Sequence, residues 1–132
     1  MDLEILRIAS NTTNNKILKN HTHSSKLKNP ICGDEMEISI KLIKDNIVDF
    51  GYQFKSCIYC QASVSLLSRN SINKSTIKIK SLLSIANIFF EKENVILPKE
   101  WSAFGKIFNK KHFSRKECLI LPFKTLAKAL KS

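Results

Sequence analysis

Two runs of alternating hydrophobic and polar residues predict a β-hairpin in the first half of the chain. A polar turn at residues 44–46 separates the runs. Because successive side chains of a strand point to opposite faces, the hydrophobic residues of both runs should share one buried face. The predicted inward-facing residues are Met36, Ile38, Ile40, Leu42, Val48, Phe50, Tyr52 and Phe54. The polar, lysine-rich stretch 17–30 is predicted to be loop, with room for one short strand at its end.

The other hydrophobic residues recur at the three-and-four spacing of helices. The predicted helical segments are residues 3–9, 61–67, 76–90, a short helix beginning near Pro98, and a last helix beginning near Ser114. Ser75 is the expected N-cap of the third segment, and Ser114 with Glu117 has the spacing of a capping box. The aromatic residues Trp101, Phe104 and Phe108 are predicted to be core residues. We therefore expect an α+β fold, in which helices pack on one side of a small antiparallel sheet of two to three strands.

Length and charge narrow the class of protein. A chain of 132 residues fits a single domain, 1–132. The N-terminus lacks the pattern of a secretory signal and no apolar stretch is long enough to span a bilayer, so we expect a cytoplasmic protein. The net charge of +11, from 22 basic and 11 acidic residues, favours encounters with acidic partners. Aromatic residues are not interleaved with the lysines as a nucleic-acid stacking surface requires, so nucleic-acid binding is not favoured.

Three of the four cysteines have the character of metal ligands. Cys32 precedes the predicted hairpin and Cys57 follows it, so the hairpin can bring both thiols to one end of the sheet. Asp34 adds a carboxylate two residues after Cys32, and Cys118 adds a third thiol near the last helix. Thiolates with one carboxylate make a four-ligand site suited to zinc or to iron with sulfide. Any one of these residues alone would more often be structural, and only the set indicates a metal site.

Cys118 is the candidate sulfur acceptor. Its predicted place at a helix N-terminus, beside Arg115 and Lys116, favours thiolate over thiol.

Several alternatives stay open. Cys60 stands at a Cys-x-x-Cys spacing from Cys57, which would suit a dithiol redox protein. Cys60 is expected instead to lie in a helix as a packing residue or a reserve thiol. A Cys32–Cys57 disulfide and a structural zinc module that binds nucleic acid are further readings. The three histidines, His21, His23 and His112, lack ligand spacing and are expected at the surface.

The order of motifs resembles the NifU/IscU superfamily of iron–sulfur cluster assembly scaffolds. The motifs are Asn-Pro-x-Cys-Gly-Asp at 29–34, a hairpin, a cysteine followed by Ala-Ser-x-Ser at 62–65, and a distant cysteine. The 61 positions from Cys57 to Cys118 resemble the SufU-type branch, which carries an insertion there. Glu117 stands where IscU-type members have histidine, and the Leu-Pro-Pro-Val-Lys segment of that type is missing. Ser56 replaces the glycine usual in the family.

The resemblance implies a non-enzymatic role in iron–sulfur cluster assembly. It implies that Cys32, Asp34, Cys57 and Cys118 hold a transient [2Fe–2S] cluster or zinc. The implied partners are a cysteine desulfurase, which delivers sulfur, and acceptor apo-proteins or other cluster-assembly proteins. The sequence does not predict an oligomeric state.

Overall fold

The sheet has three antiparallel strands in the order β1-β2-β3. The computed structural model describes residues 2–30, 33–92 and 96–131, and within these ranges the strands are β1 (His23–Lys28), β2 (Glu35–Ile43) and β3 (Asn46–Lys55). Ile38 lies opposite Tyr52 in β3, which confirms the predicted hairpin register of hydrophobic opposite hydrophobic residues. Ser25 of β1 lies opposite Ile38 on its other side, so the short strand expected before residue 30 is present.

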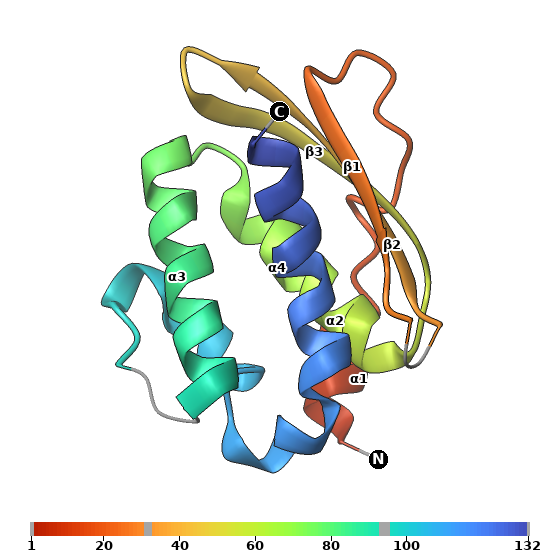
Figure 1. The fold of residues 1–132 in the computed structure, drawn as a ribbon, viewed down its shortest axis with the longest axis vertical. Coiled ribbons are helices and arrows are strands. Elements are labelled where there is room, and N and C mark those ends of the chain that lie inside the picture. The colour runs from red at the N-terminus through yellow and green to blue at the C-terminus, as the bar shows by residue number, and fades with distance from the viewer. Residues whose placement is uncertain (1, 31–32, 93–95, 132) are drawn as a thin grey trace.

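Helices cover one side of this sheet (Figure 1). The α-helices are α1 (Leu3–Ala9), α2 (Ile58–Ser71), α3 (Thr76–Lys92) and α4 (Lys116–Leu130). Two 3-10 helices, η1 (Lys99–Lys106) and η2 (Lys110–Arg115), connect α3 to α4. Helix α4 lies between α3 and the sheet, and contacts α2, α3, β1 and β2. The α+β fold expected from the pattern is confirmed. None of the described helices is both long and apolar enough to cross a membrane.

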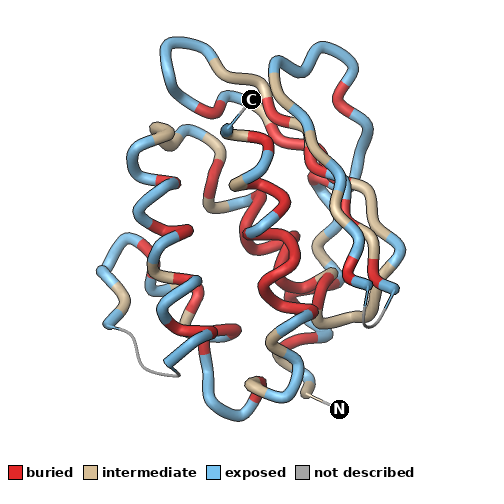
Figure 2. Tube along the Cα trace, viewed as in Figure 1, coloured by how far each residue is buried: buried red, intermediate tan, exposed pale blue. Residues whose placement is uncertain are grey.

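The core lies between the sheet and the helices, where α4 and α2 carry most of their buried residues (Figure 2). From the sheet, Met36, Ile38, Ile40 and Phe50 are fully buried. From η1, Trp101 and Phe104 are fully buried as well, which confirms the predicted role of these aromatic side chains. The fold is therefore stabilised mainly by hydrophobic burial between these two layers.

The hairpin departs from strict alternation near its turn. Lys41 pairs with Asp49 whereas Leu42 pairs with Ile47, so Val48 is an extra residue at a β-bulge. Because the bulge shifts the alternation by one residue, Ile47 is fully buried and Val48 is 38% exposed. The prediction that Val48 faces the core was wrong for this reason.

The two predicted helix caps had different outcomes. Ser75 Oγ accepts a hydrogen bond from the N–H of Lys78 at 3.2 Å, which confirms Ser75 as an N-cap. Helix α4 instead begins at Lys116, directly after η2, and its N-cap position is Arg115 without a side-chain cap. The prediction that Ser114 and Glu117 form a capping box is therefore wrong, because residue 114 lies within η2.

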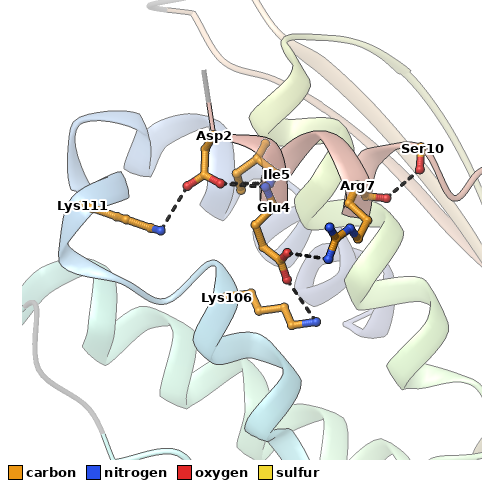
Figure 3. Close-up of polar contacts among 7 residues, drawn as sticks. All are labelled: Asp2, Glu4, Ile5, Arg7, Ser10, Lys106 and Lys111. Carbon is orange, nitrogen blue, oxygen red and sulfur yellow. Dashed lines mark hydrogen bonds and ion pairs between the residues drawn. The ribbon is translucent and has the colours of Figure 1, made fainter.

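Ion pairs attach α1 to the segment that precedes α4 (Figure 3). Asp2 caps α1 by accepting a hydrogen bond from the N–H of Glu4, and its Oδ2 lies 3.2 Å from Nζ of Lys111 in η2. Glu4 lies 3.2 Å from Nζ of Lys106 in η1. Lys106 and Lys111, which precede α4, therefore pair with acidic residues at the start of α1.

Gly51 lets the N-terminal segment cross β3 closely. A Cβ at residue 51 would lie 2.7 Å from the backbone oxygen of Lys16 and 3.2 Å from Cβ of Leu18. We expect Gly51→Ala to lower the free energy of unfolding by about 1–3 kcal/mol, because the backbone must shift to admit the methyl group. Chemical denaturation measures this change.

Gly105→Ala is a matched control for this substitution. Its added Cβ would lie 3.7 Å from the nearest side-chain atom, an ordinary contact. Its effect should stay within about 0.5 kcal/mol. Equal losses in the two variants would show that the close crossing at Gly51 is not the cause.

Candidate metal centre

Three residues distant in sequence converge at one end of the sheet. One ligand atom each from Asp34, Cys57 and Cys118 lies within 4.8 Å of the other two. These residues come from the β1–β2 connection, the β3–α2 junction and α4. Cys32, the fourth residue expected at this site, lies outside the described residues. The structure thus brings together three of the four predicted ligands.

A tight turn places Asp34 at the start of β2. The N–H of Gly33 donates to the carbonyl of Asn29 at 2.8 Å, and the N–H of Asn29 donates to the carbonyl of Asp34 at 2.7 Å. Gly33 has φ of +77°, a conformation that glycine adopts without strain. The turn holds the Asp34 carboxylate in a nearly enclosed position, with 9% of the residue exposed.

Cys57 is the N-cap residue of α2. Its backbone is extended, with φ of −74° and ψ of 169°, and its side chain makes no capping hydrogen bond. The residue is partly buried and forms no disulfide. Its thiol therefore does not cap the helix, and it faces the other two donors instead.

Cys118 lies in the first turn of α4 and is 8% exposed. Burial raises the pKa of its thiol far above the usual range, and the neighbouring Cys57 and Asp34 raise the pKa further. The prediction that the helix start favours a Cys118 thiolate is therefore wrong for the metal-free protein.

The two basic residues that precede Cys118 most closely along the chain lie over aromatic rings. The Arg115 guanidinium lies 5.3 Å from the centre of the Tyr59 ring, and Nζ of Lys116 lies 4.6 Å from that of Phe113. The side chains of Asp34, Cys57 and Cys118, each negative when deprotonated, lie close together in a largely buried site. A bound cation would compensate them.

One buried atom supports this view directly. Oδ2 of Asp34 is buried and has no hydrogen-bond partner among the described residues, which is costly for a carboxylate. A metal ion held by this oxygen and the two sulfurs would satisfy it. Thiolates with a carboxylate are donors that zinc accepts, and thiolates are the usual donors to iron–sulfur clusters. The residues present therefore fit such a group.

Cys60 is not one of the three converging residues. It is fully buried in the hydrophobic core of α2 and is not among the converging ligand atoms of the described residues.

His112 corrects a prediction, because it is 4% exposed rather than a surface residue. Its Nε2 lies 3.5 Å from Oδ2 of Asp2, and its ring meets the Tyr59 ring edge-on. Burial lowers the pKa of His112. No local pattern indicates this burial, because α1 and α2 reach His112 only in the folded chain. Sequence reasoning also missed the hydroxyl of Ser56, next to Cys57, which is buried without a hydrogen-bond partner among the described residues.

Two curated proteins with related sequences are named as scaffolds. The chain is 32% identical over 104 residues to the iron–sulfur cluster assembly scaffold protein IscU of Thermotoga maritima, covering 79% of this chain and 73% of that protein. It is 34% identical over 65 residues to the IscU scaffold of Streptococcus pyogenes, covering 49% of this chain and 39% of that protein. An uncharacterised protein of Borreliella burgdorferi is 28% identical over 131 residues, covering 98% and 88% of the two chains.

Solved structures share the fold. The N-terminal NifU-like protein of Brucella abortus superposes with a TM-score of 0.86 at 23% identity, covering 98% of this chain and 91% of that chain. A protein named as an iron–sulfur cluster assembly scaffold for the SUF system of Fervidobacterium islandicum superposes with a TM-score of 0.85 at 23% identity, covering 98% and 96%.

The sequence also matches a family model over most of its length. The model of the NifU-like N terminal domain matches residues 2–103, a range that includes Asp34 and Cys57 and ends before Cys118. With the identity to the Thermotoga protein, this match shows that the chain belongs to the family of NifU-like N-terminal domains.

Proposed function

We propose that this protein is a non-enzymatic scaffold or sulfur acceptor in iron–sulfur cluster assembly. Cys32, Asp34, Cys57 and Cys118 would hold the metal, and a cysteine desulfurase would deliver the sulfur. The observation that carries the proposal is the convergence of Asp34, Cys57 and Cys118 within 4.8 Å in a member of this family.

The donor set supports two uses of the site. Thiolates can hold iron and sulfide in a nascent [2Fe–2S] cluster, and the harder carboxylate of Asp34 is the ligand most easily exchanged when the cluster is passed on. Zinc would hold the same thiolates without a redox change, and one thiolate could leave the metal to accept sulfur. Cys118 is our candidate for that thiolate, because zinc would offset the burial that raises its pKa in the metal-free site.

The chain between Cys57 and Cys118 supports the SufU-type assignment. It contains α2, α3, η1 and η2, and η1 brings Trp101 and Phe104 into the core. An insertion at this place is thus part of the folded domain. The similarity of fold to the SUF-system scaffold over 98% of this chain is consistent with that assignment.

Two measurements test the proposal. Protein purified without oxygen should contain about one metal equivalent per chain, and elemental analysis with visible absorption distinguishes zinc from an iron–sulfur chromophore. After incubation with a cysteine desulfurase and cysteine, mass spectrometry should find a persulfide on Cys118. A chain that binds neither metal nor cluster and gains no persulfide would contradict the proposed function.

A further inference from the structure

A groove lies between α3 and α4, which run side by side (Figure 1). It consists of two hollows of about 370 and about 320 Å³, which share Asn87 of α3 and Lys124 of α4. Residues from Lys116 to Lys131 line it, so the groove follows α4 from its first residue to its C-cap. At about 1.5 Å per residue this is a length of about 22 Å, or about four helical turns.

The groove has an apolar floor and a basic rim. Leu83 and Phe90 of α3 and Phe123 of α4 form part of the floor, and each is at most 8% exposed. Ala127 of α4 lies in the middle of one hollow and is partly exposed, so the floor is shallow there. Four lysines of the last helix and its C-cap line the groove, and we call them the rim lysines: Lys116, Lys124, Lys128 and Lys131.

The charge of the rim lysines is not offset within the described part of the chain. None of the ion pairs found there involves a rim lysine. Lys128 donates a hydrogen bond to the uncharged carbonyl of Lys26 at 3.3 Å. Glu91 and Glu117 line only the hollow that Lys116 also lines. The rest of the rim therefore presents positive charge.

We propose that this groove binds an acidic amphipathic helix of a partner protein. Such a helix lays its apolar face into a hydrophobic groove, and carboxylates on its flanks would face the rim lysines. A helix about as long as α4 would fill the groove. The inference goes beyond the proposed function and does not rest on it, because the groove uses none of the proposed metal ligands.

Two other occupants fit the groove less well. A second copy of this chain has a net charge of +11 and would bring like charge to the rim. Nucleic acid would suit the lysines, but Glu91 and Glu117 would repel its phosphates. Phe90 and Phe123 are only 5% and 2% exposed, so they offer no surface on which bases could stack. The apolar floor therefore favours a protein helix.

Fluorescence anisotropy with a labelled model peptide tests the proposal. The probe is a peptide as long as α4, with leucines at three-and-four spacing and glutamates on both flanks. One control peptide has the same composition in scrambled order, and the other has lysine in place of glutamate. We expect the protein to bind the acidic amphipathic peptide at least about tenfold more tightly than either control, because only that peptide matches both floor and rim.

Variants of the groove locate the binding. Lys124→Glu/Lys128→Glu should weaken it at least about tenfold, because two attractive charges become repulsive. Lys19→Glu/Lys110→Glu makes the same change of charge at exposed lysines that do not line the groove. At about 0.15 M salt this control should lose less than about threefold, because distant charges are screened. Ala127→Gln fills the groove without a change of charge and should also weaken binding.

Carbodiimide coupling to wild type gives a second measurement that does not depend on how the variants fold. The reagent joins a carboxylate of the bound peptide to a nearby lysine amine through an amide bond. Mass spectrometry should then find the peptide on Lys124, Lys128 or Lys131 rather than on Lys19.

Equal affinity for the acidic and the scrambled peptide would overturn the inference. Equal losses in the two double variants, or coupling to lysines outside the groove, would overturn it as well. Binding of duplex DNA that depends on the rim lysines, or a dimer of wild type that Lys124→Glu/Lys128→Glu abolishes, would give the groove to a different occupant and reject the partner helix. Failure of the protein to bind metal would instead contradict the proposed function and would leave these results unchanged.

Discussion

Replacing Cys57 or Cys118 with alanine should remove most of the bound metal. Asp34, Cys57 and Cys118 are the described groups that converge, and a four-ligand site loses its closed geometry when one thiolate is gone. Mutating a residue that only hydrogen-bonds to a metal ligand typically lowers metal affinity by about 10–100-fold. Loss of a ligand itself should lower metal affinity by more than that. Competition with a chromogenic chelator measures the affinity, and Cys32→Ala tests the fourth predicted ligand in the same assay.

Cys60→Ser is the matched control for these variants. It changes a thiol three residues from Cys57 that lies in the core and outside the converging set, so its metal content should stay near that of wild type. The metal content of Asp34→Ala should lie between that of Cys60→Ser and that of the two cysteine-to-alanine variants. The reason is that a carboxylate is a weaker ligand for soft metals than a thiolate. Full metal retention by Cys57→Ala or Cys118→Ala would remove that residue from the site.

Trp101→Ala should cost about 3–5 kcal/mol of unfolding free energy, because it leaves a large cavity under η1. The side chain is fully buried, its ring lies 6.1 Å from that of Phe104, and Nζ of Lys74 lies 5.8 Å from the ring centre. Trp101 is the only tryptophan of the chain, so circular dichroism rather than fluorescence should follow urea denaturation. All samples should contain a chelator, so that bound metal does not contribute to the measured unfolding free energies.

Trp101→Phe separates packing from hydrogen bonding. The indole N–H of Trp101 is buried without a hydrogen-bond partner among the described residues, so phenylalanine fills most of the space and removes an unsatisfied donor. We expect this variant to lose only about 1–2 kcal/mol. Equal losses in both variants would mean that the N–H has a partner, such as a buried water.

Local patterns predicted the hairpin and α3 well because each of them buries mainly one face. The hairpin and α3 follow periods of two and of about 3.6 residues, and both lie where the pattern placed them. Val48 and Ser114 were mispredicted because the regular pattern is interrupted at both positions. A β-bulge exposes Val48, and the preceding 3-10 helix moves the start of α4 past Ser114. Both depend on how neighbouring segments pack.

The residues of the candidate site could be predicted from the sequence, but the pKa of Cys118 and the positions of the nearby charges could not. The order of motifs pointed to Asp34, Cys57 and Cys118, which the folded chain brings together. The sequence also placed Arg115 beside Cys118, but could not reveal that the guanidinium lies over the Tyr59 ring. The pKa of Cys118 depends on burial and on two groups more than 60 residues away along the chain, which no local window contains.

The assembly of the site from three separate parts of the chain has a thermodynamic consequence. Donors from residues 34, 57 and 118 can surround one ion only when the sheet and α4 are docked, so an ion held there would bind the native state in preference to the unfolded chain. Such a ligand stabilises the native state by about 1.4 kcal/mol for each tenfold rise in its free concentration above Kd. The melting temperature should therefore rise with metal concentration, and a thermal stability quoted for this protein has meaning only at a stated free metal concentration.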